Sequence, residues 1–427
     1  MKSFQTILLV IFGAFVIGAV MIFSGVIGGN KANQDNLISE PVIMWGTIPK
    51  ITVDDILQKV ANAGDKFDIT YVEQSSGDFE SLLIDALAAG KGPDLILVPH
   101  TLLIKQRDKL FQLPETTISE RLFRDSFVEA SENLLAGGDS LGLPLFLDPI
   151  VMYWNRDMFT RAGIATAPST WLEVQLLPEK LTKLDDKGNI TEATVAMGGV
   201  GNVAHFKDIL ATQIMQTGDN IVSLKEGLST VSLGEVAGAD SALRYYAEFS
   251  NPSLSKYSWN SAKKNSLDEF VSGKLAIYFG SASELGDIET RNPHLNFDTA
   301  NIPQISNGEH RATYADVYSL AILKNSPVTQ TAFAVAYRLA LGQTAGIISE
   351  TLRLPPARRD LLKVSAPNPY LALFYSAAVI SKTWYDPSSI VTRNIFADMI
   401  DSVIIGKASP STAISSASAR LQDLLNI

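Results

Sequence analysis

The pattern of apolar and polar positions is clearest over residues 78–99, DFESLLIDALAAGKGPDLILVP. In the first half, apolar positions recur at spacings of 3, 4, 7 and 8 residues, which predicts a helix with one buried face. Gly90 and Gly92 end this pattern, and Pro93 lacks the amide hydrogen that a helix interior needs. The apolar residues 95–98 then predict a short strand that is covered on both faces.

The end of this strand is the first candidate ligand site. A helix that feeds a buried strand belongs to a parallel sheet, and open α/β sheets bind ligands beyond the carboxyl ends of their strands. Pro99 and His100 occupy that position. Asp78 is expected to cap the helix, and the polar loop with Ser76 and Asp78 could present free amides to a hydroxylated or anionic ligand. Simple capping, or a βαβ unit without a ligand, are the alternatives.

The residues before this segment repeat the pattern. Residues 41–46 and 67–72 read as strands, and residues 53–63 read as a helix between them. The β-α-β-α-β order predicts an α/β lobe with a mostly parallel sheet.

Residues 7–29 contain no charged side chain and are mostly apolar. At about 1.5 Å per residue this run can span a bilayer core of about 30 Å, and it exceeds the apolar region of about 7–15 residues in a secretory signal. We expect residues 1–30 to form an N-terminal transmembrane helix at the cell membrane and residues 31–40 a linker. A cleaved signal is the alternative, and in both cases the folded part is extracytoplasmic.

Composition narrows the function. With 427 residues, 46% of them hydrophobic, the chain can form two cores. A net charge of −10 without clustered Lys and Arg excludes a nucleic-acid surface. The absence of Cys excludes disulfides, thiolate metal sites and a lipid-modified cysteine. Only the N-terminal apolar run is then left to hold the protein to a membrane.

Two catalytic motifs occur in unsuitable contexts. Residues 138–142 match G-x-S-x-G, but a turn precedes Ser140 and an extended run follows it, the reverse of a nucleophile elbow. Residues 199–204 match G-x-G-x-x-A, but Asp219 lies in a turn rather than at a strand end. Neither an enzyme nor a dinucleotide cofactor is expected, and the four histidines lack metal-ligand spacing.

The central and C-terminal parts contain a distinctive series of segments. In chain order these are residues 142–148 (GLPLFLD), 151–155 (VMYWN), 157–163, 168–171, 268–280 (DEFVSGKLAIYFG), 354–360 (LPPARRD) and 406–413 (GKASPSTA). The first two read as extended apolar runs that Asp148 and Pro149 separate. Together with residues 78–99, this series resembles the extracellular solute-binding proteins of the sugar-binding family, which includes the maltodextrin-binding components of ABC importers.

This resemblance implies an α/β fold of the type II periplasmic-binding-protein class, with two lobes, a ligand between them and hinge closure. Lobe one would take residues 41–145 and 300–350, and lobe two residues 149–297 and 354–427. The chain would cross between lobes near residues 145–148, 297–303 and 352–356. A permease is the implied protein partner, and a monomer is expected.

Sugars present flat C–H faces and a rim of hydroxyls, so their sites combine aromatic platforms with polar hydrogen-bonding groups. On this basis, and from the family's ligand-facing positions, the candidate residues are Trp45, Asp148, Asn202, His205, Ser281, Ser283, Glu284, Asp316, Trp384 and Arg393. Core packing for Trp45, hinge pairing for Asp148, a purely structural loop for Asn202 and His205, and surface packing for Trp384 and Arg393 are the alternatives. Asp316 is expected in a loop before a strand at residues 319–323.

The sequence thus predicts a membrane-tethered, non-enzymatic substrate-binding protein that delivers a carbohydrate to an ABC permease. A tethered sensor or adhesion protein with the same fold is the alternative. Another solute, such as a polyamine, a peptide or a glycerophosphodiester, is also open because Asp148, Glu284 and Asp316 could face a cation.

Overall fold

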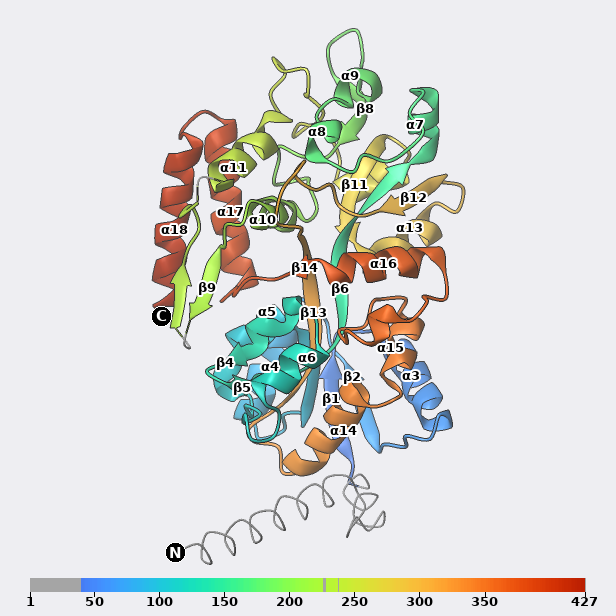
Figure 1. Ribbon diagram of the computed structural model, residues 1–427, viewed down its shortest axis with the longest axis vertical. Coiled ribbons are helices and arrows are strands. Elements are labelled where there is room, and N and C mark those ends of the chain that lie inside the picture. Colours follow the sequence, from blue (N-terminus) through green and yellow to red (C-terminus); the bar gives the residue numbers. More distant parts are fainter. Residues whose placement is uncertain (1–39, 226–227, 237, 427) are drawn as a thin grey trace, which may run out of the picture.

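The computed structural model describes residues 40–225, 228–236 and 238–426. Two α/β lobes lie one above the other along the long axis, and strands β6 (Leu143–Asn155) and β13 (Thr313–Ile322) lie at their junction (Figure 1). The two-lobed fold predicted from the sequence is therefore present.

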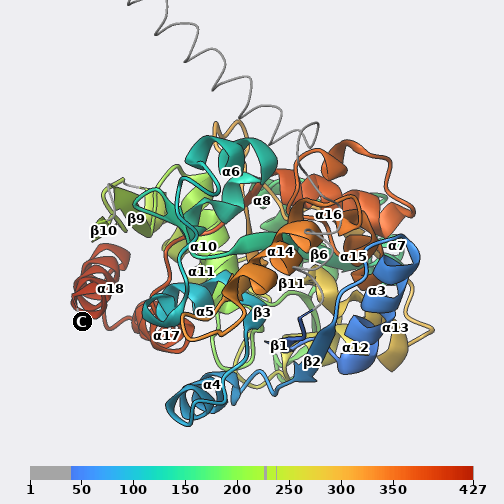
Figure 2. The same cartoon turned by 90° about the horizontal axis from the view of Figure 1, so that it is seen from below.

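The first lobe begins with the predicted β-α-β-α-β unit. Strands β1 (Val42–Gly46), β2 (Ile69–Glu73) and β3 (Leu95–Pro99) are parallel, and helices α3 (Lys50–Asn62) and α4 (Phe79–Ala88) connect them. Strand β3 is buried through Val98, as its apolar run predicts. Helix α4 lies at the periphery (Figure 2) and buries only Phe79 and Leu83, so its apolar face is narrower than the spacing suggested.

Asp78 does not cap α4 with its side chain, contrary to prediction. Its backbone lies in the helical region, with φ −107° and ψ −4°, whereas a capping side chain needs an extended backbone to reach the free amides. Its carbonyl instead accepts a hydrogen bond from the Ser81 hydroxyl at 2.9 Å.

Strand β6 is one continuous element of 13 residues rather than two runs separated at Asp148 and Pro149. Up to Pro149 it pairs with β13, and from Ile150 onward it pairs with β11 (Leu275–Ser281). Pro149 has no N–H to donate and lies where the partner strand changes, so the sheet continues through it.

Strand β13 likewise begins earlier than predicted. Asp316 lies inside the strand and not in a preceding loop, between β3 on one side and β6 on the other. Its alternation of side chains places Tyr314, Asp316 and Tyr318 on one face.

One ten-stranded sheet runs through both lobes in the order β2-β1-β3-β13-β6-β11-β8-β7, with β12 (Phe297–Ala300) on β6 and β14 (Ser381–Lys382) on β13. A third passage of the chain lies against β6, where the Leu147 amide donates to the Pro355 carbonyl at 2.9 Å. Because one sheet continues through both lobes, its strand pairing does not show at which residues one lobe ends and the other begins. The predicted lobe boundaries therefore stay a prediction.

Helix α10 (Phe206–Gln216) packs beside β13, and α11 (Gly238–Glu248), α17 (Ser389–Ile404) and α18 (Pro410–Leu425) form the outer helical layer of the second lobe. The other elements are α5 (His100–Lys105), η1 (Arg107–Lys109), α6 (Glu120–Ser126), η2 (Glu129–Leu134), β4 (Leu135–Ala136), β5 (Asp139–Ser140), α7 (Arg156–Arg161), α8 (Trp171–Val174), α9 (Pro178–Leu181), β7 (Lys183–Leu184), β8 (Ile190–Val195), β9 (Val222–Lys225), β10 (Leu228–Val231), α12 (Ser266–Val271), η3 (Ala282–Glu284), α13 (Leu285–Arg291), α14 (Thr329–Leu341), α15 (Ala345–Leu352), η4 (Leu361–Lys363) and α16 (Pro369–Val379).

Within the described residues, no helix combines the length and the apolar character needed to cross a bilayer. The anchor predicted for residues 1–30 lies outside the described residues, as does the predicted linker up to residue 39.

Candidate functional site

Five carboxylates from five separate elements meet where β6 and β13 lie between the lobes. Together with the cations of His205 and Lys207, they form what we call the crossing cluster. Its acidic members are Asp148 on β6, Asp208 on α10, Glu284 on η3, Asp316 on β13 and Asp386 in the segment before α17.

Strand pairing brings the first two carboxylates together. Asp148 and Asp316 are direct partners in the antiparallel register of β6 and β13, so their side chains share one face of the sheet. Like charges on such neighbours repel, and each disfavours ionisation of the other.

Asp148 is held by the turn that follows β11. Its Oδ1 accepts the Ser283 amide at 2.9 Å, and its Oδ2 accepts the Ser283 hydroxyl at 2.6 Å. Only 8% of Asp148 is exposed. Burial raises the pKa of Asp148 to about 6, although the two Ser283 hydrogen bonds act in the opposite direction.

His205 lies between the next two carboxylates and pairs with both. Its Nε2 lies 3.1 Å from Glu284 Oε1, and its Nδ1 lies 3.5 Å from Asp208 Oδ2. Burial alone would lower the pKa of His205, but these two carboxylates outweigh it and raise the pKa to about 10. The ring is therefore an imidazolium at neutral pH. His205 also has a left-handed backbone, φ 56°, an uncommon conformation for a residue other than Gly.

Glu284 is fixed from its other side by the start of its own turn. Its Oε2 accepts the Tyr278 hydroxyl at 2.8 Å and the Ser281 amide at 3.1 Å. Ser281 and Glu284 form a capping box.

Lys207 pairs with the fifth carboxylate. Its Nζ donates to Asp386 Oδ2 at 2.7 Å and to the Thr392 hydroxyl at 3.3 Å. Burial works against the charged form, yet Asp386 and Asp208 raise the pKa of Lys207. The same Nζ lies 5.6 Å from the ring centre of Trp384, which stacks on Phe396 and is only 3% exposed.

Asp316, like Asp148, has no cation paired with it among the described residues, but it differs from Asp148 in its exposure and in its hydrogen bonds. Its Oδ1 accepts the Tyr314 hydroxyl at 3.1 Å, and 37% of its side chain is exposed. Burial, followed by the charges of Asp208 and Asp148, raises the pKa of Asp316 to about 7. Asp316 is thus reachable by solvent and yet strongly desolvated, and we call the partly open space beside it the recess.

His100 lies beside Asp316, with its Nδ1 3.8 Å from Asp316 Oδ1. The same Nδ1 accepts the Val317 amide at 3.3 Å, so the proton is on Nε2. Burial lowers the pKa of His100 to about 3, and the ring is neutral. Its Nε2 has no hydrogen-bond partner among the described residues, although His100 is only 1% exposed.

The structure brings eight of the predicted site residues to this region. These are His100, Asp148, His205, Ser281, Ser283, Glu284, Asp316 and Trp384. No described contact tests whether any of them binds a ligand, so their role stays a prediction.

The other six predicted residues make no described contact with the members of the cluster. Ser76 and Asp78 are exposed on the loop before α4, and Trp45 is half-buried near the end of β1. Pro99 is the N-cap of α5. The remaining two make framework contacts: the Asn202 amide donates to two backbone carbonyls and accepts the Trp259 indole N–H at 3.0 Å, and the Arg393 guanidinium lies 4.4 Å from the ring centre of Phe206.

Three members of the cluster were missed in the sequence. Lys207 and Asp208 are the only charged residues of α10, which is otherwise mostly buried. Two adjacent charges in such an apolar helix could have indicated in the sequence that they have a site role. Asp386 follows Trp384 and Tyr385 directly before Pro387, and no local signal indicates its pairing with Lys207, which is 179 residues away.

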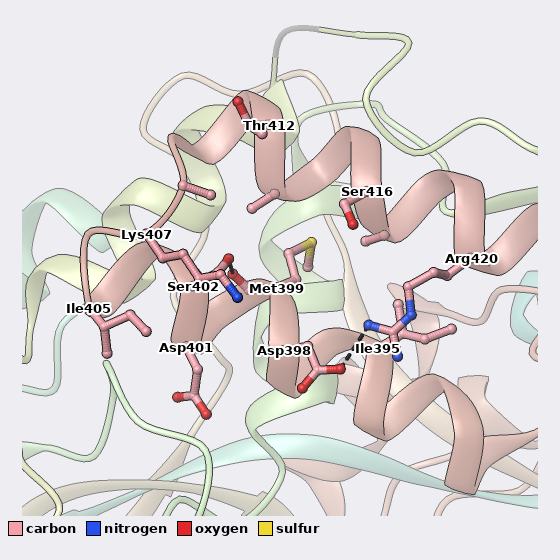
Figure 3. A pocket seen from close by; sticks show the side chains of 13 residues that line it. Ile395, Asp398, Met399, Asp401, Ser402, Ile405, Lys407, Thr412, Ser416 and Arg420 are labelled. Carbon is pink, nitrogen blue, oxygen red and sulfur yellow. Dashed lines mark hydrogen bonds and ion pairs between the residues drawn. The ribbon is translucent and has the colours of Figure 1, made fainter.

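The two larger of the described hollows lie outside the cluster. One of about 490 Å³ lies near the C-terminal end of α10, between η2 and residues 309–311. Another of about 610 Å³ lies between α17 and α18, where the Asp398–Arg420 ion pair bridges the helices at 2.7 Å (Figure 3). None of the five cluster carboxylates lines either hollow.

The rejected catalytic motif is part of the framework. Ser140 is fully buried in β5, and its hydroxyl donates to the Gly142 carbonyl at 2.7 Å.

Comparison with known proteins identifies the class. Residues 50–336 match the family described as bacterial extracellular solute-binding protein, and the chain belongs to this family. A Brucella abortus protein named only as a binding protein is 23% identical over 350 residues, which cover 79% of this chain and 81% of that protein.

Two relatives with named ligands are also similar. The maltodextrin-binding protein MdxE of Bacillus subtilis is 25% identical over 252 residues, which cover 57% of this chain and 55% of MdxE. The crystal structure of the cyclic alpha-maltosyl-1,6-maltose binding protein from Arthrobacter globiformis superimposes with a TM-score of 0.75 at 16% identity, covering 90% of this chain and 99% of that one. The resemblance stated from the sequence is confirmed.

The substitution Asp316→Asn should stabilise the ligand-free protein at pH 8. The pKa of Asp316 in the folded state, about 7, is above the ordinary value of 3.8, so the folded state loses stability as the pH rises through 7 and the carboxyl group ionises. Asn has no carboxyl group to ionise, so the variant does not lose this folding stability. We expect its Tm to rise by about 2 °C at pH 8 and to equal that of the wild type at pH 4.

The matched control is Asp423→Asn, which removes an exposed carboxylate on α18 and should leave the Tm unchanged at both pH values. Equal destabilisation by Asp316→Asn at pH 4 and pH 8 would contradict the prediction, because it would indicate a structural hydrogen bond instead of a charge cost.

Proposed function

We propose that this protein is the extracytoplasmic substrate-binding subunit of an ABC importer, and that it binds a carbohydrate in the recess beside Asp316. The observation that carries this proposal is the crossing cluster, because polar groups from both lobes converge on the strands that join them. A ligand that contacts both walls would favour the closed arrangement of the lobes, which a permease could then recognise.

The chemistry of the walls suits a hydroxylated ligand. Carboxylates, serine hydroxyls and tyrosine hydroxyls accept and donate the hydrogen bonds that a sugar rim requires. Tyr318, stacked on Phe146 at 4.7 Å, lies on the same face of β13 as Asp316 and offers an apolar surface. Both named relatives bind maltose-type saccharides according to their names, which supports the carbohydrate class.

The joining segments suit a hinge. β6, β13 and the passage at Pro355 lie side by side at the junction. Such segments can absorb a change of lobe orientation while each lobe moves as a rigid body. Nothing in the proposal requires a covalent step, which agrees with a family that binds solutes.

Ligand class is tested with the full chain in a polyoxyethylene detergent, because glycosidic detergents would compete for the site. Thermal shift and calorimetry against maltose, maltotriose, cellobiose, glucosamine, spermidine, a tripeptide and glycerophosphocholine should give saturable binding to a saccharide, with no turnover. Binding of spermidine, the peptide or the phosphodiester alone would contradict the carbohydrate assignment. Sugar binding without import in cells that also contain the candidate permease would instead favour a tethered sensor.

The two predicted tryptophan platforms should behave differently. Trp384→Ala should lower stability by about 3 kcal/mol, because the indole is buried between Lys207 and Phe396. Trp45→Ala should weaken saccharide binding about tenfold with a smaller loss of stability, since the ring is half-buried near the edge of the sheet where ligands bind. Denaturant unfolding and calorimetry separate the two effects. Unchanged affinity in both variants would refute the aromatic-platform hypothesis.

The membrane tether is part of the proposal and rests on the uncharged run of residues 7–29. We expect the full chain to stay in the membrane fraction after alkaline carbonate extraction, with its N-terminus intact by mass spectrometry. Release into the soluble fraction with residues 1–30 removed would indicate a cleaved signal instead.

A further inference from the structure

The crossing cluster contains more negative than positive charge. Its five carboxylates face only two cations, His205 and Lys207, which leaves an excess of three negative charges when all groups are ionised. Uncompensated charge in a partly desolvated site is costly, and it is retained where a ligand or function compensates it.

Both cations already pair with carboxylates of the second lobe. His205 uses its two ring nitrogens on Glu284 and Asp208. Lys207 donates to Asp386 and Thr392. Among the described residues, neither cation makes an ion pair with Asp148 or Asp316.

The two carboxylates without a cation differ in how they are hydrogen-bonded. Asp148 is buried, and Ser283 donates to both of its oxygens. Among the described residues, Asp316 accepts only the Tyr314 hydroxyl, and it remains 37% exposed. Of these two carboxylates, Asp316 is therefore the one with free acceptor positions.

Two buried donors near the cluster have no described acceptor. His100 Nδ1 lies 3.8 Å from Asp316 Oδ1, and the Nε2–H on the other side of the same ring has no acceptor among the described residues at 1% exposure. The indole N–H of Trp384, next to Lys207, is likewise buried without a described acceptor. Buried donors without partners are rare and mark sites arranged for something other than the fold itself.

One open carboxylate among otherwise paired charges selects a particular chemistry. A polyamine carries several cations and would need several open carboxylates, whereas the cluster offers one. A neutral sugar would leave the charge of Asp316 uncompensated. Resting on the proposed function, we infer that the ligand is a carbohydrate bearing a protonated amine, and that Asp316 pairs with that amine.

The inference is tested by calorimetry on matched ligands and the full chain. Glucosamine, N-acetylglucosamine and glucose are compared at pH 7, both as monosaccharides and as their β-1,4-linked disaccharides. The amine-bearing sugar should bind at least tenfold more tightly than its acetylated and hydroxyl counterparts. Asp316→Asn should remove this preference and leave affinity for the neutral sugars within about threefold, whereas Asp423→Asn should keep it.

A pH series adds a readout that a structural role would not give. The charged or titratable groups that face Asp316 are Asp208 and Lys207 on α10, Asp148 on β6, Tyr314 and Tyr318 on β13, and His100 on α5. Because a cation pairs only with the ionised carboxylate, affinity for glucosamine should rise about tenfold from pH 5.5 to pH 7 in the wild type. It should stay flat in Asp316→Asn.

The outcomes separate this inference from the proposed function. Neutral saccharides that bind as tightly as their amine counterparts would overturn the amine and leave the carbohydrate-binding function intact. Binding of spermidine but of no saccharide would overturn both. The absence of binding by every amine-bearing sugar would also overturn the inference, whatever the neutral sugars do.

Discussion

The antiparallel pairing of β6 with β13 is the constraint on which the rest of this structure depends. It joins the two lobes, and by its register it places Asp148 directly beside Asp316. Two carboxylates held on one face of a central sheet cannot both ionise without cost. The surrounding groups treat the two carboxylates differently. Ser283 donates hydrogen bonds to both oxygens of Asp148, whereas Asp316 remains open to the recess.

The charged groups around Asp148 and Asp316 form two separate sets of ion pairs, one at His205 and one at Lys207. His205 connects the turn after β11 to the start of α10, and Lys207 connects α10 to the segment before α17. Each cation thus ties together elements of the second lobe that are distant in sequence. These ion pairs fix the wall that faces Asp316, and they involve three of the five carboxylates, which leaves Asp148 and Asp316 without a paired cation among the described residues.

Several elements were predictable because their determinants are local. The helix, turn and strand of residues 78–99 follow from apolar spacing and from Gly92 and Pro93, and the structure has α4 and β3 there. The predictions failed where a local pattern met a tertiary partner. Pro149 suggested a break, but β6 continues because the strand changes partner at that residue, and Asp316 suggested a loop although it lies within β13.

The sequence by itself determined the class of fold, the order of elements, the family and the presence of acidic and aromatic groups near strand ends. It could not determine which of these groups are paired. That was decided by the tertiary structure, since His205 and Lys207 are up to 179 residues away from their partners in the sequence and meet them only when the chain folds. The distinction between a paired carboxylate and the open one at Asp316 is a property of three-dimensional neighbours, which no local pattern encodes.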